Sequence, residues 1–300
     1  MFFSKKITIA THSGNFHPDD VFSVALLSIL FNDKIKIIRT RDEDIYSKAG
    51  FILDVGGEYY PDKKRYDHHQ EGGAGKRINE IQYSTFGLLW KDFGEKICGS
   101  KKVANILDTK LVQIIDADDT AFDLYEINLP SVHPYLLTDI IYSKSPTWKE
   151  KNISLDRAFS EAVVFAKGII LREIKIENDK IEAEKIIEDI YKKSEDKRIM
   201  VFENSFLPDS LFSKYQEALF IVRPEKEGKN WKVKAINNDE KISISRKLFP
   251  EEWRGKNGLE LAKITGVKDA VFCHNSGVFS GAKTREGAIK LAELAIESKE

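Results

Sequence analysis

The first sixty residues alternate short apolar segments with one longer apolar run. Residues 6–10, 35–38 and 51–55 are short apolar runs of the kind that forms buried strands. Between the first two, residues 19–31 form a longer run of good helix formers. Two aspartates open this run, and carboxylates favour the N-terminus of a helix. The order strand, helix, strand predicts βαβ units and therefore a parallel sheet.

Farther along the chain the pattern predicts helices first and then strands. Residues 84–93 have a helical pattern, and an apolar stripe over 103–115 predicts another helix. Residues 156–193 contain no proline and repeat aliphatic side chains at helical spacing, which predicts one long helix, or two helices broken near 178–179. The elements expected after it are strands at 198–202, 218–222, 231–236 and 270–274, and helices at 259–265 and 285–298.

These elements predict an α/β protein of two domains joined by a helix. We expect a parallel-sheet domain over residues 1–155, a helical linker over 156–197 and a smaller α+β domain over 198–300. A chain of 300 residues suits this division, since domains commonly hold ~100–200 residues. Its 42% of hydrophobic residues suffice for two globular cores.

Charge and cysteine content narrow the class of protein. The chain carries 47 basic and 48 acidic residues, so no overall charge attracts it to long polyanions. Its two cysteines, Cys98 and Cys273, form no CxxC pair or disulfide framework, which suits a reducing compartment. The N-terminus lacks a signal-peptide pattern, and the most apolar stretch, 21–31, is shorter than the ~20 residues that span a bilayer. We expect a cytoplasmic protein without a membrane partner; no stable protein partner is indicated, and a homodimer stays open.

Five of the six histidines fall in three compact motifs. The first motif, HSGNFHPDD, places His12, His17, Asp19 and Asp20 on the loop between the first predicted strand and its helix. Such loops lie at the carboxyl edge of a parallel sheet, where open α/β folds bind ligands. Imidazole and carboxylate together suit Mn²⁺, Zn²⁺, Fe²⁺ or Co²⁺. The alternative is that an aspartate only caps the helix and the histidines hydrogen-bond within the loop.

Two further motifs follow the third predicted strand. Asp54 ends that strand, although a lone aspartate there is often only a turn former. Thirteen residues later comes Asp67-His68-His69. Two adjacent histidines on a strand would face opposite sides, whereas on a loop both can converge. One can then coordinate a metal while the other donates to a substrate oxyanion.

A fourth acidic group ends the helix predicted over 103–115. Three acidic residues lie at the C-terminal end of this helix, where negative charge interacts unfavourably with the helix macrodipole: Asp116, Asp118 and Asp119. The alternative is that they form an ordinary solvated helix end. A cation would relieve the unfavourable interaction, and we favour Asp116 as its ligand, with Asp119 second. The four motifs together predict a carboxylate-bridged pair of metal ions, as in enzymes that clamp both oxygens of a phosphoryl displacement.

The stretches HSGNFHPDD, DVGGEYYPDKKRYDHHQ, IIDADD, WRG and CHNSGVFSGAKTREGAIKLA together resemble the melanocyte-proliferating-gene family. This family is a branch of the DHH phosphoesterase superfamily, and its better-studied members are described as 3′–5′ RNA exonucleases. The resemblance spans essentially the whole chain. It implies a DHH-type first domain and an active site in the cleft between two domains.

The resemblance also implies a ligand set drawn from all four motifs. Asp54 would bridge the two ions and His69 would donate to the substrate phosphate, so that Asp54, His68 and His69 form the catalytic group. DHH enzymes often carry Asp-x-Asp where this chain has residues 17–19. The division of ligands between the metals therefore stays open, and Asp20 is an alternative ligand. The implied metal ligands are His12, His17, Asp19, Asp54, His68 and Asp116.

The segment around His274 resembles the glycine-rich substrate-binding element of the superfamily's second domain. Small residues let backbone N–H groups approach a phosphate, and the N-terminus of the following helix adds a favourable dipole. The alternative is an ordinary strand–turn–helix in which the glycines serve only geometry. The expected substrate-binding residues are His69, Arg246, Arg254, His274, Gly277 and Gly281.

We therefore expect a hydrolase with two divalent cations, Mn²⁺ first and Mg²⁺, Zn²⁺ or Co²⁺ as alternatives. A closing cleft and a near-neutral chain favour the ends of short oligomers, and the resemblance implies 3′–5′ cleavage of short RNA or related nucleotides. Aromatic platforms would favour a base-containing substrate, and Trp231 and Trp253 are candidates, although each is more often a core residue. The alternatives are a small-molecule phosphatase or pyrophosphatase, and a non-catalytic metal-binding regulatory module.

Overall fold

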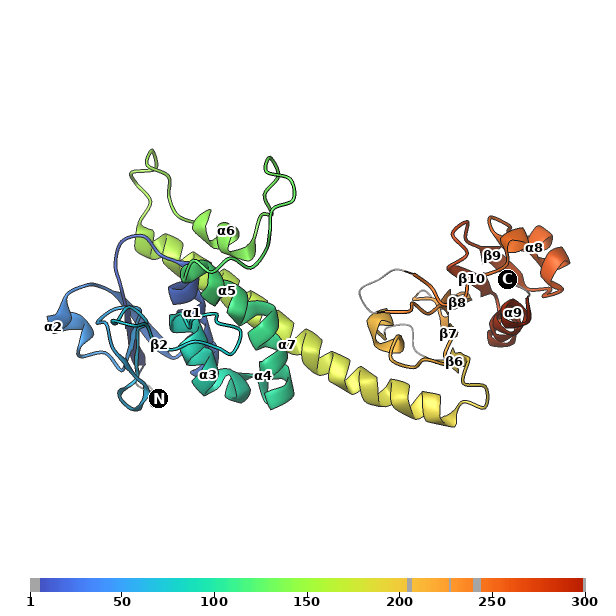
Figure 1. Ribbon diagram of the computed structural model, residues 1–300, viewed down its shortest axis with the longest axis horizontal. Helices are drawn as coiled ribbons and strands as arrows, with labels where there is room; N and C mark the ends of the chain where they lie inside the picture. The colour runs from blue at the N-terminus through green and yellow to red at the C-terminus, as the bar shows by residue number, and fades with distance from the viewer. Residues whose placement is uncertain (1–5, 204–206, 227, 240–243, 299–300) are drawn as a thin grey trace, which may run out of the picture. The chain divides into compact units, whose positions relative to one another are not determined.

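The computed structural model describes residues 6–203, 207–226, 228–239 and 244–298 (Figure 1). Its contacts divide the chain into two compact units, Met1–Glu177 and Asn178–Glu300. The boundary falls inside one long helix, so the two units are described separately. None of the described helices has an apolar stretch long enough to cross a membrane.

The first unit is built on a five-stranded mixed sheet with the order β2-β1-β3-β5-β4. Neighbours among β1, β2, β3 and β5 run parallel, and β4 pairs antiparallel with β5 at the edge. The predicted α/β class is confirmed, and the antiparallel edge strand is an addition to the predicted parallel sheet. The strands are β1 (Ile7–Thr11), β2 (Ile35–Arg39), β3 (Phe51–Leu53), β4 (Tyr59–Tyr60) and β5 (Arg65–Tyr66).

Helix α1 (Pro18–Leu30) connects β1 to β2 and lies in the core of this unit. A proline begins it, and Asp20 accepts a 3.0 Å hydrogen bond from the backbone N–H of His17, which closes its N-terminus. Its residues are buried on all sides over the first three turns, as expected of a helix that is apolar around its whole circumference. Phe22 packs against Phe86 of a neighbouring helix, with ring centroids 5.4 Å apart.

The stripe predicted as one helix over 103–115 is divided in the structure. A π-helical turn, Asp108–Val112, separates two α-helices and changes the direction in which the second presents its side chains. The remaining helices of this unit are short or flank the sheet. They are α2 (Glu43–Tyr46), α3 (Thr85–Cys98), α4 (Lys101–Leu107), α5 (Gln113–Asp119) and α6 (Leu137–Tyr142).

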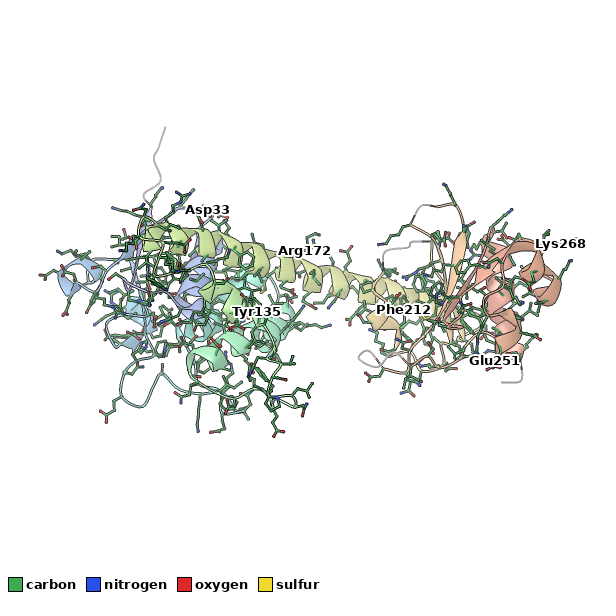
Figure 2. The ribbon with its side chains drawn as sticks, turned by 90° about the horizontal axis from the view of Figure 1, so that it is seen from above. Asp33, Tyr135, Arg172, Phe212, Glu251 and Lys268 are labelled. Carbon is green, nitrogen blue, oxygen red and sulfur yellow. The ribbon has the colours of Figure 1, made fainter. Side chains whose placement is uncertain are left out.

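Helix α7 (Leu155–Lys193) is continuous, so the alternative of two broken helices does not apply (Figure 1). Its first half belongs to the first unit: Arg39 of β2 bonds to Asp156 at 2.9 Å, and Lys167 pairs with Asp33, which Figure 2 places beside the helix. Its last turns belong to the second unit, where Ile187 is fully buried. The long run without proline thus spans the boundary between the units.

The second unit is an α+β structure on a mixed sheet with the order β6-β7-β8-β10-β9. Among the described strands of this sheet, β6 and β7 pair in parallel and the other neighbours pair antiparallel. One face packs on α9 around Phe220 and Leu291, and the other on the end of α7 around Met200 and Phe212. The elements are β6 (Ile199–Val201), β7 (Phe220–Pro224), β8 (Trp231–Ala235), α8 (Gly258–Thr265), β9 (Ala270–Cys273), β10 (Phe279–Ala282) and α9 (Arg285–Glu297).

Candidate metal centre

Three of the histidine and aspartate motifs begin where parallel strands end. His12 follows β1, Asp54 follows β3 and Asp67 follows β5. These strands are neighbours in the sheet and run in the same direction, so their carboxyl ends share one edge. Side chains far apart in the sequence therefore meet there, at the position where open α/β sheets bind ligands.

Asp54 lies at the middle of the cluster. One carboxylate oxygen, Oδ2, is 3.2 Å from Nε2 of His12, and the other, Oδ1, is 3.7 Å from Nδ1 of His68. Oδ1 is also 3.3 Å from Nδ1 of His69. Asp54 has a φ of +52°, in the left-handed region that non-glycine residues rarely adopt. Such strain is characteristic of functional sites, where the surrounding fold imposes it.

Among the residues that the structure describes, three overlapping groups of side chains could each hold a cation. In each group, one ligand atom per residue lies within 4.8 Å of the others. Asp54 belongs to two groups and His17 to two, so the groups form one continuous site. They are Asp54 with Asp67, His68 and His69; His12 with His17 and Asp54; and His17 with Asp19 and Asp119.

Buried polar atoms without hydrogen-bond partners test whether this site fits metal ions. Both carboxylate oxygens of Asp19 are such atoms in the described part of the chain, while Oδ2 of Asp20 lies 3.2 Å from Nε2 of His12 and Oδ2 of Asp119 lies 2.9 Å from Nε2 of His68. Leaving polar atoms buried and unpaired is costly, and burying charges costs more. Divalent cations would satisfy all of them at once, so the donor set fits imidazole and carboxylate coordination.

The pKa shifts point to an excess of negative charge. Burial raises the pKa of Asp19 well above its ordinary value, and the charges of Asp54 and Asp119 raise it further. Burial lowers the pKa of His12, but hydrogen bonds to Asp20 and Asp54 outweigh it and raise the pKa to about 9. The imidazolium that results provides positive charge that a bound cation would replace.

His12 and His68 each have a polar neighbour at Nδ1 that restricts the orientation of the ring. Nδ1 of His12 lies 3.3 Å from the carbonyl oxygen of Ser13, and Nδ1 of His68 lies 3.3 Å from Oγ1 of Thr85. When these Nδ1–H groups donate, Nε2 of both rings is left to bind metal. Nε2 of His68 accordingly lies 2.9 Å from Oδ2 of Asp119.

His69 differs from the other two in being accessible. Its Nδ1 is 2.8 Å from Oδ1 of Asp67, and 59% of its side chain is exposed. Hydrogen bonds to Asp54 and Asp67 raise the pKa of His69 to about 10. Asp67 is itself held by a 2.7 Å hydrogen bond from the backbone N–H of Gly57. His69 is thus a fixed, protonated donor at the rim of the cluster.

Asp116, the favoured ligand of the fourth motif, does not belong to this cluster. Its Oδ1 accepts hydrogen bonds from Oγ of Ser84 at 2.5 Å and from the backbone N–H of Gly87 at 3.0 Å, at the start of α3. Its Oδ2 lies 2.5 Å from Nη1 of Arg77. The carboxylate is already paired, so Asp119, the second choice and the last residue of α5, takes its place beside His68.

Sequence reasoning missed Thr85 altogether. Its hydroxyl lies 3.4 Å from Oδ1 of Asp54 and 3.3 Å from the carbonyl oxygen of Tyr66, besides its contact with His68. Thr85 is the first residue of α3, directly after Ser84, at the start of the stretch predicted as helical over 84–93. A polar residue at a helix N-terminus was the available signal.

The arginines predicted to bind substrate are engaged within the second unit. The guanidinium of Arg246 donates to the carbonyl oxygens of Tyr215 at 2.5 Å, Ala218 at 2.9 Å and Ser213. It therefore holds a turn together, and the expected phosphate contact is not supported. Nε of Arg254 donates to the carbonyl oxygen of Phe249 at 2.9 Å.

The predicted glycine-rich element forms the hairpin between β9 and β10. His274 is exposed, bonds to Oγ of Ser276 at 2.7 Å and stacks on Phe279. Gly277 has a φ of +67°, which the turn requires. A Cβ on Gly281 would come within 3.0 Å of the Trp231 carbonyl oxygen, so this glycine permits close strand packing. Of the predicted substrate residues in this unit, His274 has the most accessible side chain.

Fold and site together define an α/β protein with a candidate divalent-metal centre at the carboxyl edge of its first sheet. The chain belongs to the family described as Uncharacterised protein family (UPF0160), whose model, MYG1_exonuc, matches residues 8–296. The resemblance to the melanocyte-proliferating-gene family is thereby confirmed.

Relatives from distant organisms match over nearly the whole chain. The MYG1 protein of Caenorhabditis elegans is 30% identical, over 96% of this chain and 95% of its own length. A MYG1 protein of Chlamydia pneumoniae is 30% identical, over 97% of each chain. The MYG1 exonuclease of Bos taurus is 27% identical, over 96% of this chain and 84% of its own. An exopolyphosphatase-related protein of Bacteroides fragilis covers 98% of this chain and 92% of that chain at 12% identity, but its TM-score of 0.23 is too low to carry an argument.

Proposed function

We propose that this chain is a metal-dependent phosphoesterase of the DHH type, acting as a 3′–5′ exonuclease on short RNA or related nucleotides. The observation that carries the proposal is the position of Asp54, which contacts His12 through one oxygen and His68 and His69 through the other. A carboxylate with ligands on both sides is suited to bridging two cations. The name exonuclease given to the Bos taurus relative supports the same reaction class.

The proposed ligand set is the one expected from sequence, with Asp119 in place of Asp116. Asp54 would hold both ions, Asp20 is a further candidate ligand, and Mn²⁺ is the proposed ion because imidazoles and carboxylates are mixed. When bound, two such ions would supply an activated water and charge stabilisation for the attacking and leaving oxygens. The remaining ligands are His12, His17, Asp19, His68 and Asp119.

The chain's own residues orient and stabilise the substrate phosphate. His69, which is exposed and held by Asp67, donates from Nε2 to a phosphate oxygen. Thr85 keeps His68 and Asp54 in position through its hydroxyl. We further propose that His274, Arg254 and the backbone around Gly277 and Gly281 bind the substrate in the second unit.

A hydrolysis assay with matched variants tests the proposal. The protein is incubated with Mn²⁺ and short oligoribonucleotides carrying a label at the 5′ or the 3′ end, and the products are separated by length. We expect stepwise shortening from the 3′ end, and a loss of at least ~100-fold in rate for Asp54→Asn. The exposed Asp62 supplies the control, since Asp62→Asn changes charge equally but lies outside the cluster. Equal rates for wild type and Asp54→Asn would refute the assignment.

A further inference from the structure

A pocket of about 510 Å³ lies along α5, the helix that carries the proposed metal ligand Asp119. Ala117 and Asp118 line it from α5, and Phe122 and Tyr125 line it from the loop that follows. None of these residues belongs to the proposed ligand set. The volume falls within the range of small-molecule sites.

A hydrogen bond and a ring contact connect this pocket to the metal cluster through Tyr142. Asp118 accepts from the hydroxyls of Thr138 and Tyr142, each at 3.2 Å. The Tyr142 ring in turn packs edge-on against His17, with centroids 6.5 Å apart. Asp119, the next residue along α5, reaches His68. The pocket therefore shares α5 with the proposed ligand Asp119, and it is linked to His17 through Asp118 and Tyr142.

The end of α5 fixes Phe122 relative to Asp119. The backbone N–H of Phe122 donates to the carbonyl oxygen of Ala117 at 2.8 Å, and that of Ala121 donates to Asp118 at 3.3 Å. Ala121 has a φ of +54°, so these bonds form the Schellman arrangement that ends many helices. Alanine is strained in this left-handed backbone conformation, whereas glycine would not be. Backbone strain of this kind is common at binding sites.

The lining of the pocket selects against a phosphate and for a flat ring. Phe122 and Tyr125 are 39% and 49% exposed, so their rings offer surfaces for stacking. The charged residues that line the pocket are Asp118 and Asp123, and no lysine, arginine or histidine is among the described lining residues. Carboxylates repel a phosphate but accept hydrogen bonds from amino groups, and each oxygen of Asp118 can accept a second bond.

We propose that this pocket binds the base of the nucleotide whose phosphate lies at the metal centre, with Phe122 and Tyr125 stacking on the ring and Asp118 accepting from its exocyclic amino group. The inference rests on the proposed function and names the part of the substrate that the first unit recognises. It assigns base recognition to this loop, whereas Trp253, one of the aromatic residues considered from sequence, is buried in the core of the second unit.

A binding measurement that needs no turnover tests the pocket. The probe is 2-aminopurine riboside 5′-monophosphate with Mn²⁺, whose fluorescence falls when its base stacks. We expect quenching by the wild type, and a dissociation constant raised about tenfold by Phe122→Ala, because stacking on one aromatic side chain contributes roughly this much. The matched control is Leu129→Ala, an exposed residue of the same loop outside the lining. Circular dichroism confirms that both variants are folded.

A kinetic comparison separates this inference from the proposed function. An RNA dinucleotide and the same dinucleotide lacking one base are hydrolysed by wild type, Phe122→Ala and Asp118→Asn. We expect the variants to raise KM about tenfold for the complete substrate and to leave KM for the abasic substrate unchanged. An equal change in KM for both substrates would contradict base binding in this pocket. Unchanged probe binding in the variants, even with an altered oligomeric state, would contradict it too. If the wild type hydrolyses neither substrate, the proposed function fails, and the fluorescence result alone decides the pocket.

Discussion

The carboxylate of Asp116 accepts a hydrogen bond of 3.0 Å from the backbone N–H of Gly87, so a residue of α5 caps the N-terminus of α3. Helix N-termini leave backbone donors without partners, and a carboxylate there also interacts favourably with the helix dipole. Thr85, in the same first turn, contacts Asp54 and His68. The cap therefore stabilises the helix end that supports the metal cluster.

This contact predicts that Gly87→Ala destabilises the protein. A Cβ at Gly87 would overlap the Asp116 carboxylate, which is held on its other side by Arg77. Overpacking of this kind costs ~1–3 kcal/mol in unfolding free energy. Gly168→Ala is the control, because nothing lies near a Cβ there, and it should stabilise α7 by ~0.5–1 kcal/mol. Urea unfolding of both variants measures the difference; equal stabilities would contradict the cap.

We expect loss of Asp119 to weaken Mn²⁺ binding and loss of Asp116 to lower the stability of the fold. Asp119→Ala removes a proposed ligand, so Mn²⁺ affinity should fall by ~10-fold or more while the fold is retained. Asp116→Ala leaves the guanidinium of Arg77, which is 7% exposed, with Asp108 as its remaining carboxylate partner, and it leaves the buried hydroxyl of Ser84 without its acceptor. The unfolding free energy should then fall by ~1–3 kcal/mol. Calorimetric Mn²⁺ titration and urea unfolding of both variants decide this, and a stable Asp116→Ala protein that has lost Mn²⁺ binding would restore Asp116 as the ligand.

The same pair of residues marks the boundary of what the sequence could predict. His12 and Asp54 could be predicted as neighbours because each follows an apolar strand, and parallel strands bring their carboxyl ends together. The sequence could not decide whether Asp116 or Asp119 faces the cluster. That choice depends on a π-helical turn and on Arg77, a residue distant in sequence whose guanidinium occupies Asp116.

In the second unit the limit was of another kind. The predicted strands were found, but β10 was missed because its residues, Phe279–Ala282, are mostly small and have weak strand propensity. Arg246 was expected to bind phosphate on the ground of its charge. Its actual partners are backbone carbonyl groups, and every residue has one, so no sequence pattern marks them.

Both cysteines should be unreactive in the folded protein. Burial raises the pKa of the thiols of Cys98 and Cys273 to about 11. Because the folded pKa lies above the ordinary value, each thiol stabilises the fold at pH below ~8.5, and this stability is lost as pH rises toward 11. Thiolates are the reactive form, so a disulfide reagent at pH 8 should label the native protein slowly and both thiols at once after denaturation. Rapid labelling of the native protein at pH 7 would show that a thiol is accessible and ionised.

We expect Asp19→Asn to be more stable than the wild type without metal and less stable than the wild type with Mn²⁺ bound. Asp19 is fully buried with no hydrogen-bond partner for either oxygen, and burial and neighbouring carboxylates raise its pKa. In the metal-free protein asparagine removes this repulsion and can donate to Asp54 or Asp119, so the variant should melt at the higher temperature. A raised folded pKa means that ionised Asp19 costs stability as pH rises, so the variant's advantage should grow from pH 5 to pH 8.

Saturating Mn²⁺ should reverse this order. A cation that binds only the folded state stabilises it by about 2.7 kcal/mol at a hundred times its dissociation constant, and the variant gains less because a neutral amide is a weaker ligand than Asp19. Melting curves of both proteins in a chelator and in Mn²⁺ measure the crossover, with the exposed Asp62→Asn as the control that should show none. If Asp19→Asn is the less stable protein in both conditions, the carboxylate has an ordinary structural role. A crossover would instead mean that the unpaired acids of this sheet edge are maintained at the expense of stability because they bind metal.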